Sequence, residues 1–158
     1  MLKGFTSTLQ RETKMIVCLG EEGMSLDPGV IYLAPGDRHM YVDPSSHKIK
    51  LSDAPPINFV KLAADPLFQS LGMSFGDQAL GVVLTGLGRD GAQGALEIHK
   101  HGGKVLIQDP STAVAPSMPT SARDTGVVDG IEPLERLGPA VAGVCAGLSY
   151  KLKRRVAS

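Results

Sequence analysis

The sequence predicts an α/β protein with a doubly wound, mainly parallel β-sheet and a small antiparallel β-ribbon. From residue 81 onward, short apolar runs alternate with turns and helical stretches, which is the pattern of parallel strands joined by right-handed crossovers. Before that point, short strand-like runs are separated only by turn residues, as in an antiparallel meander. We assign residues 1–150 to one domain and residues 151–158 to a basic tail.

The first half of the chain is divided by turn chemistry. Thr6 can cap a short helix that leads into an apolar strand, and turns such as Asp27-Pro28-Gly29 and Pro35-Gly36-Asp37 separate the runs that follow. We expect the last three strands of this half to form the ribbon or meander. The expected elements are a helix over 5–11, strands over 15–19, 30–34, 40–42 and 48–51, and a helix over 66–75.

The second half follows the strand–turn–helix alternation. Its first strand, Val82-Val83-Leu84 with its neighbours, is apolar without interruption, as expected for a strand covered on both faces. Gly102-Gly103 ends the helix after it. The expected elements are strands over 81–85, 104–107 and 127–131, and helices over 92–101, 119–125 and 134–148.

Composition indicates a cytoplasmic globular protein. The 16 basic and 16 acidic residues give a formal net charge of zero, so no global field attracts nucleic acid or a membrane. No apolar run approaches the roughly 18 residues that span a bilayer. Cys18 and Cys145 lie in apolar surroundings, so we expect buried thiols of a reducing compartment. The four histidines lack zinc-site spacing, and we expect no metal or cofactor.

The segment Gly81–Gly94 (GVVLTGLGRDGAQG) is the strongest candidate site. Its glycines allow a tight turn, and the helix that follows points unpaired N–H groups back at Asp90. Such a turn orients a catalytic carboxylate or holds an anion. The candidate binding residues are Thr85, Gly86, Leu87, Gly88, Arg89, Gly91, Asp109 and Met118.

Two further sequence strings match known functional motifs. The turn reads G-x-G-x-x-G, and Asp109 lies 23 positions after Gly86, where a ribose-binding acid stands in dinucleotide folds. Nucleotide binding, with Arg89 and the helix N-terminus holding phosphate, is therefore an alternative. Gly72-Met73-Ser74-Phe75-Gly76 matches the nucleophile-elbow string G-x-S-x-G, but Ser74 follows a helix and precedes a strand, the reverse of an elbow.

The turn, together with the Gly102–Asp109 string and Met118-Pro119, resembles the chemotaxis receptor methylesterase domain, the CheB type. The likeness extends upstream through Gly4-Phe5-Thr6 and Asp65-x-Leu67-Phe68-x-Ser70 to cover nearly the whole chain. It implies a serine-hydrolase scaffold that acts on glutamate methyl esters of chemoreceptors. In that family the aspartate of L-T-G-x-G-x-D-G, here Asp90, orients a histidine that deprotonates a serine.

The chain departs from the family's pattern in several places. No G-x-S-x-G-G turn occurs in it, and the family's serine and histidine belong to sequence before residue 4. Val60-Lys61-Leu62-Ala63 replaces the family's H-R-P-S, and Leu87 replaces a methionine. The resemblance therefore implies an N-terminally truncated, degenerate domain without the family's first two strands, which would lie between the strands at 15–19 and 81–85.

These features give three hypotheses. The first is a methylesterase-like pseudoenzyme that acts as a binding or regulatory module in chemosensory or related signalling, with Asp90 as a vestigial triad member. The second is the nucleotide-binding alternative. The third is an active methylesterase completed in trans or by further N-terminal sequence. Because two strand edges would be bare, we expect a homo-oligomer or a partner protein, such as a chemosensory protein, to cover them.

Overall fold

The fold is an α/β arrangement of mainly parallel strands with a small antiparallel pair, as the sequence predicts. The computed structural model describes residues 2–57, 59–60 and 62–147, so the expected basic tail lies outside the described residues. The helices are α1 (Leu2–Glu12), α2 (Ala64–Phe75), α3 (Ala92–Lys100), α4 (Ser117–Asp124) and α5 (Leu134–Cys145), with short 3₁₀ turns η1 (Gly76–Gln78) and η2 (Pro110–Thr112). The strands are β1 (Ile16–Leu19), β2 (Val30–Leu33), β3 (His39–Val42), β4 (Ile49–Ser52), β5 (Leu80–Val83), β6 (Lys104–Gln108) and β7 (Gly130–Glu132).

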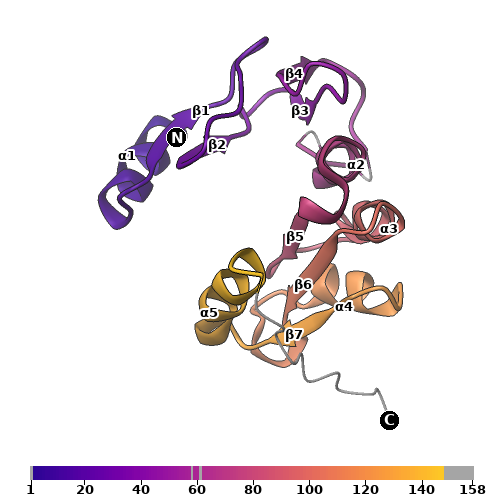
Figure 1. Cartoon of the computed structure of the whole chain (residues 1–158). Coiled ribbons are helices and arrows are strands. Elements are labelled where there is room, and N and C mark those ends of the chain that lie inside the picture. Colours follow the sequence, from indigo (N-terminus) through magenta and orange to yellow (C-terminus); the bar gives the residue numbers. More distant parts are fainter. Residues whose placement is uncertain (1, 58, 61, 148–158) are drawn as a thin grey trace.

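The C-terminal half, which we call the body, is built on the parallel sheet β5-β6-β7. Helices α3 and α4 cover one face of this sheet and α5 covers the other (Figure 1). Val105 and Ile107 of β6 point into the core under α3 and α4, whereas Leu106 points toward Leu137 of α5. All three β6 side chains are fully buried, because a central strand with helices on both faces meets no solvent.

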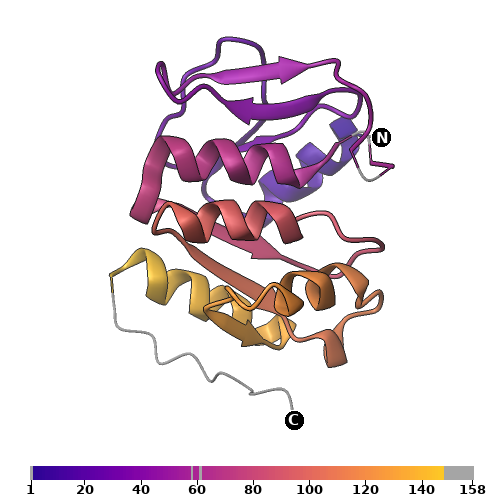
Figure 2. The same cartoon turned by 90° about the vertical axis from the view of Figure 1, so that its right-hand side faces the viewer.

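Helices α2 and α3 run parallel and side by side, with their N-termini at the same end (Figure 2). Glycines allow this close approach. A Cβ on Gly94 of α3 would lie 2.5 Å from the Cβ of Phe68, and one on Gly72 of α2 would lie 3.1 Å from the carbonyl oxygen of Glu97. Side chains at these two positions would force the helices apart, so the glycines set the distance between them.

The N-terminal part does not form the expected meander. Strand β2 pairs in parallel with β1, and only β3 and β4 form the antiparallel ribbon. The reason lies in the segment between β1 and β2. Its backbone is tied to β4 by hydrogen bonds from Gly23 N to Ile49 O and from Ile49 N to Met24 O, and this route returns the chain to start β2 beside the start of β1. The ribbon packs on α2.

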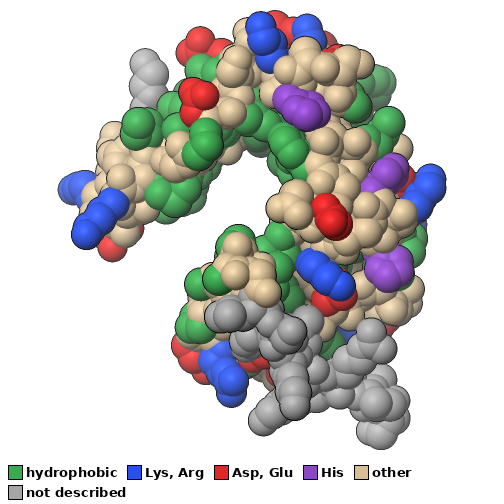
Figure 3. All heavy atoms as spheres, viewed as in Figure 1, with side chains coloured by type: hydrophobic (Ala, Val, Ile, Leu, Met, Phe, Trp, Pro, Cys, Tyr) green, Lys and Arg blue, Asp and Glu red, His purple; other side chains and the backbone are tan. Residues whose placement is uncertain are grey.

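We call α1, β1 and β2 the arm. A hollow separates the arm from the body, so the molecule is C-shaped in the space-filling view of Figure 3. The sheet β1-β2 is not hydrogen-bonded to β5-β6-β7, and hydrophobic side chains lie on the walls of the hollow (Figure 3). The outer edge of β5 carries the backbone groups of Leu80, Val82 and Leu84, because alternate residues of a parallel strand point away from the neighbouring strand.

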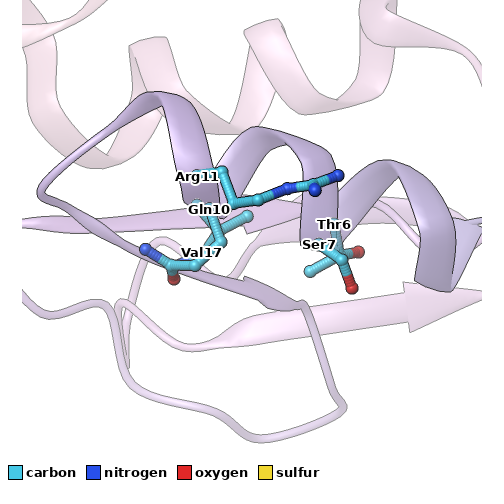
Figure 4. A pocket seen from close by; sticks show the side chains of 5 residues that line it. All are labelled: Thr6, Ser7, Gln10, Arg11 and Val17. Atoms are coloured by element: carbon cyan, nitrogen blue, oxygen red, sulfur yellow. The ribbon is translucent and has the colours of Figure 1, made fainter.

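A glutamine side chain covers part of the outer edge of β1. Gln10 of α1 donates from Nε2 to the carbonyl oxygen of Met15 (2.8 Å) and accepts at Oε1 from the amide of Val17 (2.8 Å). Ile16 N–H points the other way, to Gly29 of the β2 side. Gln10 also lines a shallow groove with Thr6, Ser7, Arg11 and Val17, shown in Figure 4.

Two smaller expectations are wrong. The strand expected over 127–131 begins only at Gly130, because Asp129 is engaged at the start of β6, where its Oδ2 accepts from the amide of Val105 (2.9 Å). Cys145 is exposed at the end of α5 instead of buried, since the helix turns that residue away from the sheet, and Cys18 is half-buried. The end of the helix expected over 134–148 lies outside the described residues.

Candidate functional site

The glycine turn after β5 is held open by the segment that precedes α4. The hydroxyl of Thr85 accepts from the amide of Ala115 (2.9 Å), and the amide of Gly86 donates to the carbonyl of Ala115 (2.9 Å). Gly86 also accepts from the amide of Met118 (3.1 Å). A Cβ on Gly86 would collide with the flexible side chain of Met118, so a larger residue there would have to move Met118 Sδ.

The Asp90 carboxylate points away from solvent and caps helix α2. Its Oδ2 accepts from the amide of Ala64 (2.7 Å), and its Oδ1 accepts from the amides of Asp65 (3.1 Å) and Gly91 (3.1 Å). The side chain is 5% exposed. An ionised carboxylate offers about four acceptor positions. Three are therefore filled by backbone N–H groups, and one, on Oδ2, remains for a further donor.

Asp65 caps helix α3 in return. Its Oδ1 accepts from the amides of Gly91 (2.9 Å) and Gly94 (2.7 Å), the N-cap and first-turn residues of that helix. Each helix is thus capped by an aspartate from the other. Two parallel N-termini in contact place their positive dipole ends together, and the two carboxylates balance them. Gly91 has φ +91°, a left-handed conformation that favours glycine.

The two buried carboxylates interact electrostatically. Burial raises the pKa of Asp65 above its ordinary value, and the nearby charge of Asp90 raises it further. The hydrogen bonds from Gly94 and Gly91 and the charge of Arg89 oppose this effect, because they favour the ionised form. The net result is a carboxyl group that holds its proton to a higher pH than an exposed aspartate does.

His39 of β3 lies against the same helix end. It is 2% exposed; its Nδ1 accepts from the amide of Ala63 (3.3 Å), and its Nε2 therefore carries the proton donated to the carbonyl of Pro55 (3.1 Å). The N-terminus of α2 is consequently held by His39 and Asp90 together. Both ring nitrogens of His39 are engaged with backbone groups, so His39 supports the helix and is not free to act as a base.

The remaining predicted site residues fall into three places. Gly86 and Met118 meet as described, and the amide of Gly88 donates to Ser117 Oγ (3.1 Å). Leu87 is 81% exposed at the tip of the turn, and Arg89 lines a groove between α3 and α4. Asp109 lies in a different part of the fold from Asp90. Its carboxylate caps η2 by accepting from the amide and hydroxyl of Ser111.

This geometry bears on the nucleotide-binding alternative. The amides of Gly91 and Gly94 at the start of α3 are already bound to Asp65. A phosphate there would have to displace that carboxylate and approach Asp90 as well. Nucleotide binding stays a prediction that this arrangement does not favour.

Ser74 lies within α2 and not on a strand-to-helix elbow. Among the residues that the structure describes, no cluster of three or more His, Cys, Asp or Glu side chains could hold a metal ion. Within the same residues, no helix combines the length and the apolar character needed to cross a bilayer.

The sequence profile described as CheB methylesterase matches residues 1–141 of this chain. The chain belongs to this family. A protein-glutamate methylesterase/protein-glutamine glutaminase of Caulobacter vibrioides is 40% identical over 152 residues, and one of Pyrococcus horikoshii is 42% identical over 141 residues. These alignments cover 90% and 88% of this chain but only 43% and 38% of the relatives, so the chain spans about two fifths of their length.

The CheB likeness extends to three dimensions. The crystal structure of the Thermotoga maritima CheB methylesterase catalytic domain matches with a TM-score of 0.85 and 28% sequence identity. The match covers 90% of this chain and 76% of the Thermotoga chain. The fold around Asp90 is therefore that of a CheB catalytic domain, and about a quarter of that domain has no counterpart here.

Sequence reasoning identifies Asp90 at the turn but misses the residues that contact its carboxylate. Asp65 was noted only as part of a family string, although an aspartate in the first turn of a helix is a common signal for N-terminal stabilisation. That signal points to the aspartate's own helix. The reach of Asp65 to α3 follows from helix packing, which no local pattern encodes.

Proposed function

We propose that this chain is the aspartate-bearing part of a methylesterase-type domain and that its 158 residues bind a partner and do not hydrolyse an ester by themselves. The observation that carries the proposal is the Asp90 carboxylate, which is buried, fixed by three backbone N–H groups and left with one open acceptor position. No G-x-S-x-G-G turn occurs in the sequence, and a carboxylate alone cannot carry out acyl transfer by the serine route.

The proposed setting is cytoplasmic chemosensory or related signalling, where the chain acts as a regulatory module. The basis is the named activity of its relatives, which are protein-glutamate methylesterases. In this view the scaffold and its aspartate keep the shape of a methylesterase site without the serine and histidine.

The test is ester hydrolysis by the purified chain. Methanol release from methylated chemoreceptor and the cleavage of a generic ester are measured for the wild type and for Asp90→Ala. The proposal expects wild-type rates equal to those of a buffer blank. Hydrolysis above the blank that disappears in Asp90→Ala would overturn it.

The hollow between the arm and the body is the surface on which we expect a partner to bind. We infer that a second copy of this chain covers it. In each copy the arm and the body form the two walls of one hollow. A two-fold symmetric dimer would therefore cover the hollow of each copy with the other copy. The zero net charge means that copies do not repel each other. Light scattering on the purified chain should give twice the 16.6 kDa chain mass. A monomer at micromolar concentration contradicts this part of the proposal.

The open acceptor position on Asp90 favours one second candidate, an active methylesterase completed by further sequence or in trans. A donor N–H, such as that of an imidazole, fits this position. The candidate requires that the chain, when mixed with a polypeptide that carries a G-x-S-x-G-G turn and a histidine, gains methylesterase activity dependent on Asp90. If the mixture stays at the blank rate, this candidate fails.

A further inference from the structure

We propose that Asp65 is the positioning residue for Asp90, acting through the reciprocal pair of helix caps. The proposal rests on the proposed function only in treating Asp90 as the site carboxylate. It concerns how this chain holds that group still.

Asp65 and Asp90 share one backbone N–H donor. The amide of Gly91 donates both to Asp65 Oδ1 (2.9 Å) and to Asp90 Oδ1 (3.1 Å). Asp65 therefore binds the residue that follows Asp90 in the chain, while its own backbone N–H binds Asp90 directly (3.1 Å). Asp65 therefore holds the Asp90 turn through two groups, its side-chain carboxylate and its backbone N–H.

Local geometry alone would not keep Asp90 in place. Gly88, two residues before Asp90, has φ +97°, and Gly91, directly after it, has φ +91°, so glycines on both sides give the backbone of the turn freedom. Leu87, at the tip of the turn, is 81% exposed, so its side chain does not stabilise the turn by packing. The bonds from Asp65 to Gly91 and Gly94 fix the start of α3, and with it the direction of the Asp90 side chain.

The two carboxylates also influence each other through their charges. Asp65 and Asp90 are 8% and 5% exposed, so both carboxylates lie close together away from water. Arg89 precedes Asp90 in the turn, Asp124 of α4 lines the same groove as Asp65, and His39 of β3 faces the preceding helix position. Because the two carboxylates share one donor, a change in the charge of Asp65 should change the electric field at Asp90.

The experiment uses NMR on the ¹⁵N-labelled 158-residue chain, with the amide of Ala64 as reporter. This amide donates to Asp90 and not to the Asp65 side chain. In Asp65→Ala we expect its protection from hydrogen exchange to fall at least tenfold more than that of Leu106, in the core of the body. In Asp65→Asn, which keeps an acceptor oxygen for Gly91 and Gly94, the protection should stay near the wild-type value.

A matched control separates positioning from general loosening. Ser70→Ala in the same helix removes the hydrogen bond from the amide of Val42 without touching Asp90. It should leave the ratio of Ala64 to Leu106 protection unchanged. If Asp65→Ala lowers both amides equally, Asp65 is only structural and the proposal is wrong.

The pH profile provides a measurement that does not depend on the alanine variant folding. In the wild type the chemical shift of the Ala64 amide should change as Asp65 loses its proton, and in Asp65→Asn this change should be missing. Superimposable profiles would overturn the proposal. Neither measurement requires hydrolysis, so a failure here leaves the proposed function untouched, and the reverse also holds.

Discussion

The arm and the body contain apolar strands of similar composition, yet they bury them to very different extents. In β6 of the body, Val105, Leu106 and Ile107 have no solvent exposure, because helices cover the sheet on both faces. In β1 of the arm, Ile16 is 63% exposed, although its sequence neighbours are equally apolar. An apolar strand is therefore buried only where the fold packs a second layer against it.

Alanine substitutions at Leu106 and Ile16 test this contrast between body and arm. Leu106→Ala should lower the free energy of unfolding by about 2–5 kcal/mol, since it leaves a cavity between β6 and α5. Ile16→Ala should cost less than about 0.5 kcal/mol, because an exposed side chain loses little. Urea denaturation measures both. If Ile16→Ala costs as much as Leu106→Ala, Ile16 is buried against another polypeptide in solution.

A second pair of variants asks how tightly the body is packed. Gly94→Ala places a methyl group 2.5 Å from Phe68 Cβ, so we expect a loss of about 1–3 kcal/mol from overpacking. Gly4→Ala, in helix α1 of the arm, meets nothing within 4 Å and should raise stability by about 0.5–1 kcal/mol. Thermal unfolding gives the change in stability of each variant relative to the wild type. Equal changes of one sign would contradict the close contact of α2 and α3.

A third, smaller effect is a pH dependence located in the body. The folded state raises the pKa of Asp65 above its ordinary 3.8, so it binds more protons than the unfolded chain in the interval above that value. The Asp65 contribution to stability therefore falls as pH rises through this interval and is constant beyond it. Stability of the wild type minus that of Asp65→Asn, measured by urea unfolding between pH 4 and 7, should decline with pH. A flat or rising difference contradicts the raised pKa.

The smallest effect belongs to the arm. Gln10→Ala removes two hydrogen bonds at the outer edge of β1 and should cost about 1 kcal/mol or less, because the site is open to water. The exchange rate of the Val17 amide should nevertheless rise, while that of Leu106 in the body stays unchanged. Equal acceleration of both amides would show that the arm and the body unfold as one unit.

The sequence predicted well where patterns are local. The strand, glycine turn and helix around Asp90 lie where their periodicity and glycines place them, because the same residues set backbone conformation and burial. It failed at β2, where the partner was decided by backbone bonds from residues 23–24 to Ile49, far along the chain. Strand partners depend on such long-range contacts, which a turn signal does not contain.

The candidate site divides in the same way. Asp90 could be chosen from its turn, but the contacts that fix its carboxylate come from the start of α2, 25 and 26 residues away. His39, on the ribbon, accepts from the amide of Ala63 at the same helix end and is further from Asp90 along the chain than these residues. Reciprocal caps of this kind arise from two helices meeting, so they become visible only once the packing is known.

The amide of Gln10 also limits how the protein can associate. It occupies one hydrogen-bonding position of β1 with one donor and one acceptor, as a residue of a neighbouring strand would. A strand that joins this edge must first release that side chain, so the two new bonds there only replace two old ones. Adding a strand at this edge therefore gains little from backbone hydrogen bonds. It is favoured only for a partner that also buries apolar side chains against the arm.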